Sequence, residues 1–265
     1  MKNSRIDKAL ESDLPFKPNP LYGTGVFRRR VRLRKQESKG RSTEQLVIAD
    51  LEDDNHRFRI MLYHDGQVVT RIEGEALRYP LTTCPGSLDL LKELVGTPLS
   101  DDPRSLGVRL DPRRFCTHQF DLAGLAITHA LRDGIEQQYD IIVHDQTVGE
   151  DMCGWHKVEA AINGQTVFKW DLKDFVIQSE GLWNNVSIMH GFSKWAVGHL
   201  LGSELEAALI LTRAVFVSNS RRFDISSMAG KPALIAFMQK DVCYSYRSPI
   251  VEQATYVGDA FKDET

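Results

Sequence analysis

One order of segments, strands followed by two helices, occurs twice in this chain and constrains its fold more than any other feature. In the first copy, residues 56–77 alternate between apolar and polar side chains around an Asp-Gly pair that ends at Gly66. Residues 155–177 repeat the pattern around an Asn-Gly pair that ends at Gly164. Such pairs between two β-rich runs are typical of tight hairpin turns.

Helical periodicity follows the strands in both copies. In the first copy, leucines recur on one face of residues 85–96, and a second helix is expected within 113–133. In the second copy, residues 190–202 and 203–217 show helical patterns in the same order. Self-similarity in a constant order indicates repeated architecture. The sequence therefore predicts an α+β fold of two duplicated units that form a pseudo-twofold domain; chance similarity between common motifs is the alternative.

These boundaries divide the 265 residues into four segments. We expect residues 1–23 to be a polar N-terminal arm, 24–134 the first α+β unit and 135–225 the second. Residues 226–265 lie outside the repeat, and their aromatic side chains predict a C-terminal extension packed on the domain.

Composition narrows the partners and the compartment. The net charge of −3 gives no global attraction to nucleic acid or to an anionic membrane. The longest apolar run, 207–217, is far shorter than the roughly 20 residues that span a bilayer. The four cysteines include no Cys-x-x-Cys pair, so neither a disulfide framework nor a zinc knuckle is indicated. We expect a soluble, cytoplasmic protein with no nucleic-acid or membrane partner.

The segment 25–36 reads as an amphipathic strand with a cationic face. Phe27, Val31 and Leu33 occupy one face. Four arginines at every second position occupy the other face: Arg28, Arg30, Arg32 and Arg34. We expect them to lie on a solvated face, paired with acidic residues such as Glu52, Asp53 and Asp54. Together with the arm, this strand is expected at the subunit boundary of a homodimer.

The strongest candidate for chemistry is Cys116-Thr117-His118 at the start of the helix in 113–133. Thr117 is expected as the N-cap and His118 as the first helical residue. The helix dipole disfavours a cation there, so a neutral imidazole that can act as a base is favoured, and Cys116 is expected to tend toward thiolate. The alternative is a capping threonine beside a packed core histidine and an inert cysteine.

Other candidates lie near the matching ends of the two units. Tyr79 and Cys84 are expected near His118, with Tyr79 as a proton donor or as an aromatic residue that plugs the loop. In the second unit, Trp183, His190 and Trp195 predict an aromatic pocket, although Trp195 also fits the core. These side chains complete the predicted site, with His118, Tyr79 and His190 as catalytic residues and five binding residues: Cys84, Cys116, Thr117, Trp183 and Trp195.

No metal site or cofactor is predicted. His-Asp pairs occur at 64–65 and 144–145, but neighbours in a strand point to opposite faces and do not easily bind one ion. The sequence contains no glycine-rich phosphate loop, HExxH or GxSxG motif.

Two resemblances bear on function. "CPGSLDLLKELVG" and "RRFCTHQFDLAGLAITHA" resemble a bacterial family of uncharacterised proteins marked by Cys-Thr-His before a helix, over roughly 25–133. The two-unit chain resembles a group of aromatic-catabolism proteins that includes phenylcoumaran gamma-formaldehyde lyases, which cleave lignin-derived aryl dimers without a cofactor. This second resemblance implies a cofactor-independent lyase, acting by general acid-base catalysis on a small aromatic substrate and releasing formaldehyde. A non-catalytic module that binds an aromatic ligand or a partner is the alternative.

Overall fold

The computed structural model describes residues 17–36, 44–148, 154–235 and 241–258. Within them, nine strands form one antiparallel sheet in the order β4-β3-β2-β1-β5-β7-β8-β9, with β6 paired to β7. The strands are β1 (Val26–Gln36), β2 (Gln45–Asp53), β3 (Arg57–His64), β4 (Val69–Arg78), β5 (Glu136–His144), β6 (Thr147–Val148), β7 (Gly154–Ile162), β8 (Gln165–Lys173) and β9 (Val176–Ile177).

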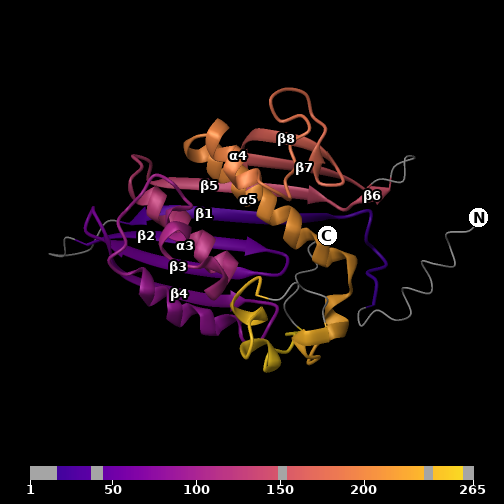
Figure 1. Cartoon of the computed structure of the whole chain (residues 1–265), viewed down its shortest axis with the longest axis horizontal. Helices are drawn as coiled ribbons and strands as arrows, with labels where there is room; N and C mark the ends of the chain where they lie inside the picture. Colours follow the sequence, from indigo (N-terminus) through magenta and orange to yellow (C-terminus); the bar gives the residue numbers. More distant parts are fainter. Residues whose placement is uncertain (1–16, 37–43, 149–153, 236–240, 259–265) are drawn as a thin grey trace, which may run out of the picture.

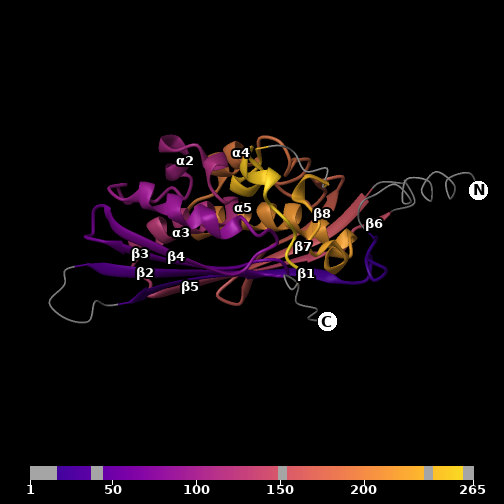
Figure 2. The same cartoon turned by 90° about the horizontal axis from the view of Figure 1, so that it is seen from below.

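The helices lie together on one face of this sheet (Figures 1 and 2). They are α2 (Ser105–Arg109), α3 (Thr117–Ala130), α4 (Phe192–His199) and α5 (Gly202–Ser218). The described residues also include 3₁₀ segments: η1 (Cys84–Leu94) before α2, η2 (Pro112–Arg114) between α2 and α3, and, after α5, η3 (Asn219–Arg222), η4 (Ile225–Met228), η5 (Ala233–Ile235), η6 (Tyr244–Tyr246) and η7 (Ile250–Glu252). The predicted α+β class is confirmed. The described residues contain no helix that is long and apolar enough to cross a membrane.

Both predicted hairpin turns are present. Gly66 has φ of 94° in the β3–β4 turn, and Asn163 and Gly164 have φ of 50° and 82° in the β7–β8 turn. Glycine and asparagine adopt these left-handed conformations at little steric cost. The first predicted helix differs from expectation, because Cys84–Leu94 forms 3₁₀ turns.

The two halves of the sheet meet where β1 pairs with β5. From this pair, β2, β3 and β4 extend in one direction, and β7, β8 and β9 extend in the other. In the first half the sheet runs β1, β2, β3, β4, and Gly66 follows β3, the third strand. In the second half it runs β5, β7, β8, β9, and Gly164 follows β7, the second strand. The two hairpins that the sequence aligns therefore occupy different positions in the sheet, and the alignment does not show a duplication.

Strand β1 alternates as its sequence predicts. Phe27, Val31 and Leu33 are buried against the helices, and the four alternate arginines face the uncovered side. Three of these arginines pair with acidic residues other than those expected: Arg30 with Asp140, Arg32 with Glu136 and Arg34 with Asp50. Since β2 and β5 pair with both of its edges, β1 has no free edge.

The largest core lies between the sheet and helices α3 and α5. The predicted helical stripe is confirmed, because His118, Leu122, Leu125 and His129 are all buried. A second, smaller cluster joins the described C-terminal residues to the segment after β4; it contains Leu81, Cys84, Met228, Ala233, Val251, Ala254 and Tyr256.

Candidate active site

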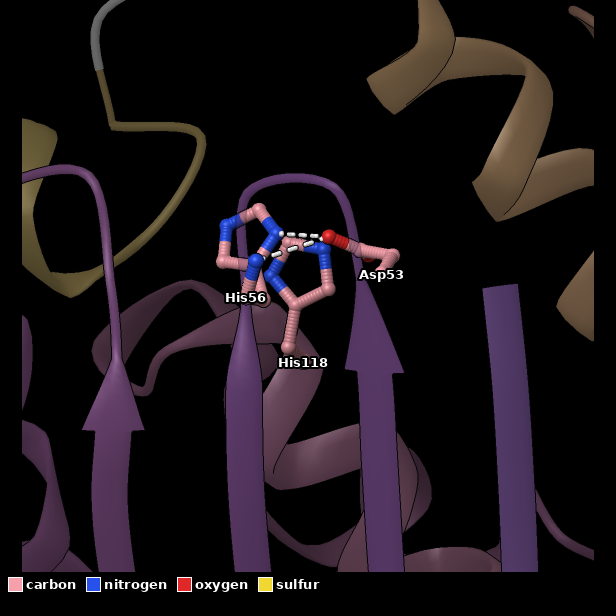
Figure 3. A group of neighbouring side chains, drawn as sticks. All are labelled: Asp53, His56 and His118. Atoms are coloured by element: carbon pink, nitrogen blue, oxygen red, sulfur yellow. Dashed lines mark hydrogen bonds and ion pairs between the residues drawn. The ribbon is translucent and has the colours of Figure 1, made fainter. Parts of the chain in front are cut away.

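The turn between β2 and β3 carries a buried carboxylate that binds its own backbone. Asp53 Oδ1 accepts hydrogen bonds from the amides of Asn55 and His56, at 2.9 and 2.8 Å. The same oxygen lies 3.0 Å from Nδ1 of His56 (Figure 3). Three donors on one oxygen hold the turn in one conformation, with the His56 ring against the carboxylate.

The second oxygen of Asp53 binds Arg29, which reaches it from β1. Nε and Nη2 of Arg29 lie 2.9 and 2.6 Å from Oδ2. The side chains of Arg29 and Asp53 are only 1% and 0% exposed. Burial alone would raise the pKa of Asp53, but the charges of His56 and Arg29 outweigh burial and lower that pKa. Asp53 is therefore a fixed anion inside the fold.

His118, from the first turn of α3, stacks on the other side of His56. The ring centroids are 3.9 Å apart with an interplanar angle of 28°. Nη2 of Arg29 lies 3.1 Å from Nε2 of His118, and because a guanidinium only donates, this nitrogen accepts. Burial, followed by the charges of His56 and Arg29, holds the pKa of His118 well below its usual value. His118 is therefore neutral and carries its proton on Nδ1.

The two rings thus have complementary hydrogen-bonding roles, assigned from their partners. When His56 is neutral, its Nδ1–H donates to Asp53 and its Nε2 has a free lone pair. His118 offers the opposite group, Nδ1–H. Among the described residues, neither of these two nitrogens has a hydrogen-bond partner. Both lie on the side away from Asp53 (Figure 3). The two rings therefore present a proton acceptor and a proton donor on the same side.

Three of these residues also form a group of possible metal ligands. Asp53, His56 and His118 offer ligand atoms within 4.8 Å of one another, a set that suits divalent transition metals. However, both oxygens of Asp53 already accept hydrogen bonds, and Arg29 lies between Asp53 and His118. The lone pairs of an imidazole lie in its ring plane, so those of stacked rings do not converge on one ion. The geometry fits a resident guanidinium better than a metal.

The structure corrects the predicted start of α3. The N-cap is Cys116, in an extended conformation, and Thr117 is the first helical residue. The Cys116 amide donates to Oγ of Ser87 at 2.6 Å, which satisfies this amide without a threonine cap. Burial, reinforced by nearby cysteines, raises the pKa of the Cys116 thiol well above its usual value, so the expected thiolate is wrong. The pKa of Cys84 is likewise raised, to about 11, chiefly by burial.

Tyr79 lies at the same end of the sheet as His118, because β4 runs back to the start of β3. Its neighbour Arg78 donates to the backbone carbonyls of Asp53 and His56. Tyr79 itself packs, half-buried, against both hydrophobic clusters. This placement fits the packing alternative for Tyr79.

The predicted residues of the second unit lie elsewhere. Trp183 packs against Trp170 of β8 and against Trp195 of α4, and His190 is exposed before α4. Four inter-strand steps separate β8 from β2, about 19 Å at the usual spacing. The structure therefore does not bring His190 to His118, because their neighbouring strands belong to opposite halves of the sheet. The two tryptophans belong to an aromatic cluster with Phe168 and Phe192.

Three residues of the site were not predicted as functional groups from the sequence: Arg29, Asp53 and His56. One signal was available, since Arg29 is the only charge on the apolar face of β1 between Phe27 and Leu33. The His-Asp pairs behave as expected. His64 is buried beside the exposed Asp65, and Asp145 is buried beside the exposed His144.

Comparisons with known proteins add little. No protein-family model and no curated protein matches the chain. A crystal structure of the MHC-like protein MILL2 matches with a TM-score of 0.23 at 10% identity, over 74% of this chain. The chain spans 64% of the length of that structure. A TM-score this low says nothing about the function of the chain.

Asp54, beside the site, makes stability depend on pH. Burial and the neighbouring Asp53 raise the pKa of Asp54 to about 6, although Arg221 partly opposes them. A carboxyl with a raised folded-state pKa binds its proton more tightly in the folded protein, so stability falls as pH rises from about 4 to about 6. Asparagine does not titrate, so the Asp54→Asn variant lacks this pH dependence. We therefore expect the difference in unfolding free energy, wild type minus Asp54→Asn, to fall by about 1–3 kcal/mol as the pH rises over this range. Urea titrations at several pH values measure it; a difference independent of pH would contradict the assignment.

Proposed function

We propose that this chain is a cofactor-independent enzyme that acts on a small molecule by acid-base catalysis, with His56 as the proton-transferring group and Nδ1–H of His118 as hydrogen-bond donor to the oxygen that gains charge. The observation that carries the proposal is the pair of complementary nitrogens, Nε2 of His56 and Nδ1–H of His118, on stacked rings. Asp53 orients the His56 ring through Nδ1, as carboxylates commonly do for functional histidines, and Arg29 orients the His118 ring through Nε2. The resemblance to aromatic-catabolism lyases suggests an aromatic substrate and formaldehyde as product.

In this proposal, the reaction is a retro-aldol cleavage. Nε2 of His56 takes the proton of a primary hydroxyl group on the substrate. The C–O bond becomes a carbonyl as the adjacent C–C bond breaks, and formaldehyde leaves. The electron pair of the broken bond passes through the conjugated system to an acceptor oxygen, and Nδ1–H of His118 donates a hydrogen bond to the negative charge that forms there. The proton held by the His56 imidazolium then passes to the product, directly or through solvent, which restores the neutral His56 ring. The predicted base thus moves from His118 to His56, because Arg29 occupies Nε2 of His118.

The experiment is incubation of the full chain with a panel of aryl dimers that carry a primary hydroxyl group, with formaldehyde as the readout. We expect release of formaldehyde, unchanged when a chelator is present, because Arg29 takes the position that an ion would need. Activity lost on chelation and restored by zinc or manganese would replace the acid-base proposal with a metal mechanism.

A non-catalytic module remains the second candidate. The cluster of Trp170, Trp183, Trp195 and Phe192 favours it, because Trp183 and Trp195 are only half-buried and could contact an aromatic ligand. Binding of the dimers without any turnover would support this module and reject the lyase.

Duplication, assembly and location belong to the same proposal. Each half of the sheet is an antiparallel run of strands followed by helices on the same face, which supports an ancestral duplication in a different alignment. We propose a cytoplasmic homodimer. A monomeric mass in light scattering at micromolar concentration would reject the dimer.

A further inference from the structure

Two consecutive residues of η3, Ser220 and Arg221, contact the side chains of the β2–β3 turn. Oγ of Ser220 lies 2.6 Å from Nδ2 of Asn55, and Arg221 lies 3.4 Å from the carboxylate of Asp54. Asp54 and Asn55 are the middle residues of the turn, whereas the flanking residues Asp53 and His56 form the site.

Arg221 is itself anchored on its other side. Its Nε and Nη2 lie 2.7 and 3.3 Å from the oxygens of Asp145, at the end of β5. Oδ2 of Asp145 also accepts the amides of Gly23 and Gly25, at 3.1 and 3.0 Å. Arg221 therefore bridges two carboxylates and joins the turn to the chain before β1, to β5 and to the end of α5.

We propose that Arg221 is a positioning residue for the site of His56 and His118. Arg221 holds the β2–β3 turn through Asp54, and Ser220 holds the same turn through Asn55. This turn fixes the orientation of the His56 ring. This inference rests on the proposed function only for its effect on turnover. The effect on the ring follows from the contacts alone. The three donors that reach Oδ1 of Asp53 all come from this turn, so a loosened turn changes the hydrogen bond at Nδ1 of His56.

The test is nitrogen-15 NMR of the histidine side chains in the full-length protein and in Arg221→Ala, Arg221→Lys and Asp54→Asn. We expect loss of the hydrogen-bonded Nδ1–H signal of His56 in Arg221→Ala and Asp54→Asn, and its recovery in Arg221→Lys, which keeps the charge. Turnover, where it exists, should fall by about 10- to 100-fold, as for a displaced catalytic group.

The matched control is Arg222→Ala. Arg222 is the next residue of η3, but its guanidinium contacts Gln146 and lies over the Tyr22 ring. A His56 signal that is unchanged in Arg221→Ala, or that is lost equally in Arg222→Ala, would overturn the positioning role. Because the signal does not depend on any substrate, this outcome is distinct from failure to find turnover. Thermal unfolding of each variant shows whether a lost signal reflects a lost fold. If Arg221→Ala does not fold, the His56 signal in Arg221→Lys decides: its presence supports the positioning role, and its loss in a folded Arg221→Lys protein overturns it.

Discussion

Replacement of His56 by glutamine is expected to lower turnover of an active substrate by about 100-fold or more, the usual effect of removing a general base. The backbone amides of residues 55 and 56 still donate to Oδ1 of Asp53 in this variant, so the turn keeps these two hydrogen bonds. What is lost is the free Nε2 lone pair. Steady-state kinetics on the formaldehyde-releasing substrate, together with the melting temperature, measures the effect.

The control is His144→Gln, because His144 is exposed at the end of β5 and lies outside the site. Its turnover should equal that of wild type. A His56→Gln variant with normal turnover would remove His56 from the mechanism. His118→Ala should also lower turnover, but unlike a surface histidine it should lower stability too, because Nη2 of Arg29 loses an acceptor.

Replacement of Asp53 by alanine should have the largest effect on stability. It would leave the Arg29 guanidinium, whose side chain is 1% exposed, without its counter-ion. Breaking a buried ion pair by removing one partner costs about 3–5 kcal/mol, because the remaining charge is uncompensated. The amides of Asn55 and His56 would also lose their acceptor. Urea unfolding followed by circular dichroism measures the loss.

Asp140→Ala is the matched comparison. Asp140 pairs with Arg30 on the uncovered face of the sheet, where the side chains are 28% and 61% exposed. Exposed pairs contribute about 0–1 kcal/mol. Similar losses in the two variants would mean that the Arg29–Asp53 pair has no special role in the fold.

Much of the fold followed from the sequence because the patterns were local. The alternation in β1 and the turn pairs that end at Gly66 and Gly164 depend on neighbouring residues only. The order of strands in the sheet depends on pairing between distant segments, above all β1 with β5, which no local pattern indicates. For that reason the predicted alignment of the two copies does not match positions in the sheet.

The site was predicted only in part for the same reason. The position of His118 on the buried stripe of α3 was correct, because helical spacing determines it. Its partners come from β1 and from the β2–β3 turn, so only the tertiary structure brings Arg29, Asp53 and His56 to it. The thiolate expectation for Cys116 failed because it considered the helix dipole and not the desolvation that raises the thiol pKa.

The most direct test of the proposed roles of His56 and His118 is the protonation state of His118 in the resting protein, read by nitrogen-15 NMR with His118→Gln to assign the signals. Because its pKa is well below the usual value, His118 should remain neutral at about pH 5.5, where an ordinary imidazole is about 90% protonated. Its proton should be on Nδ1, since Nε2 accepts from Arg29. A His118 that is protonated at this pH, or that carries its proton on Nε2 when neutral, would contradict the proposed donor.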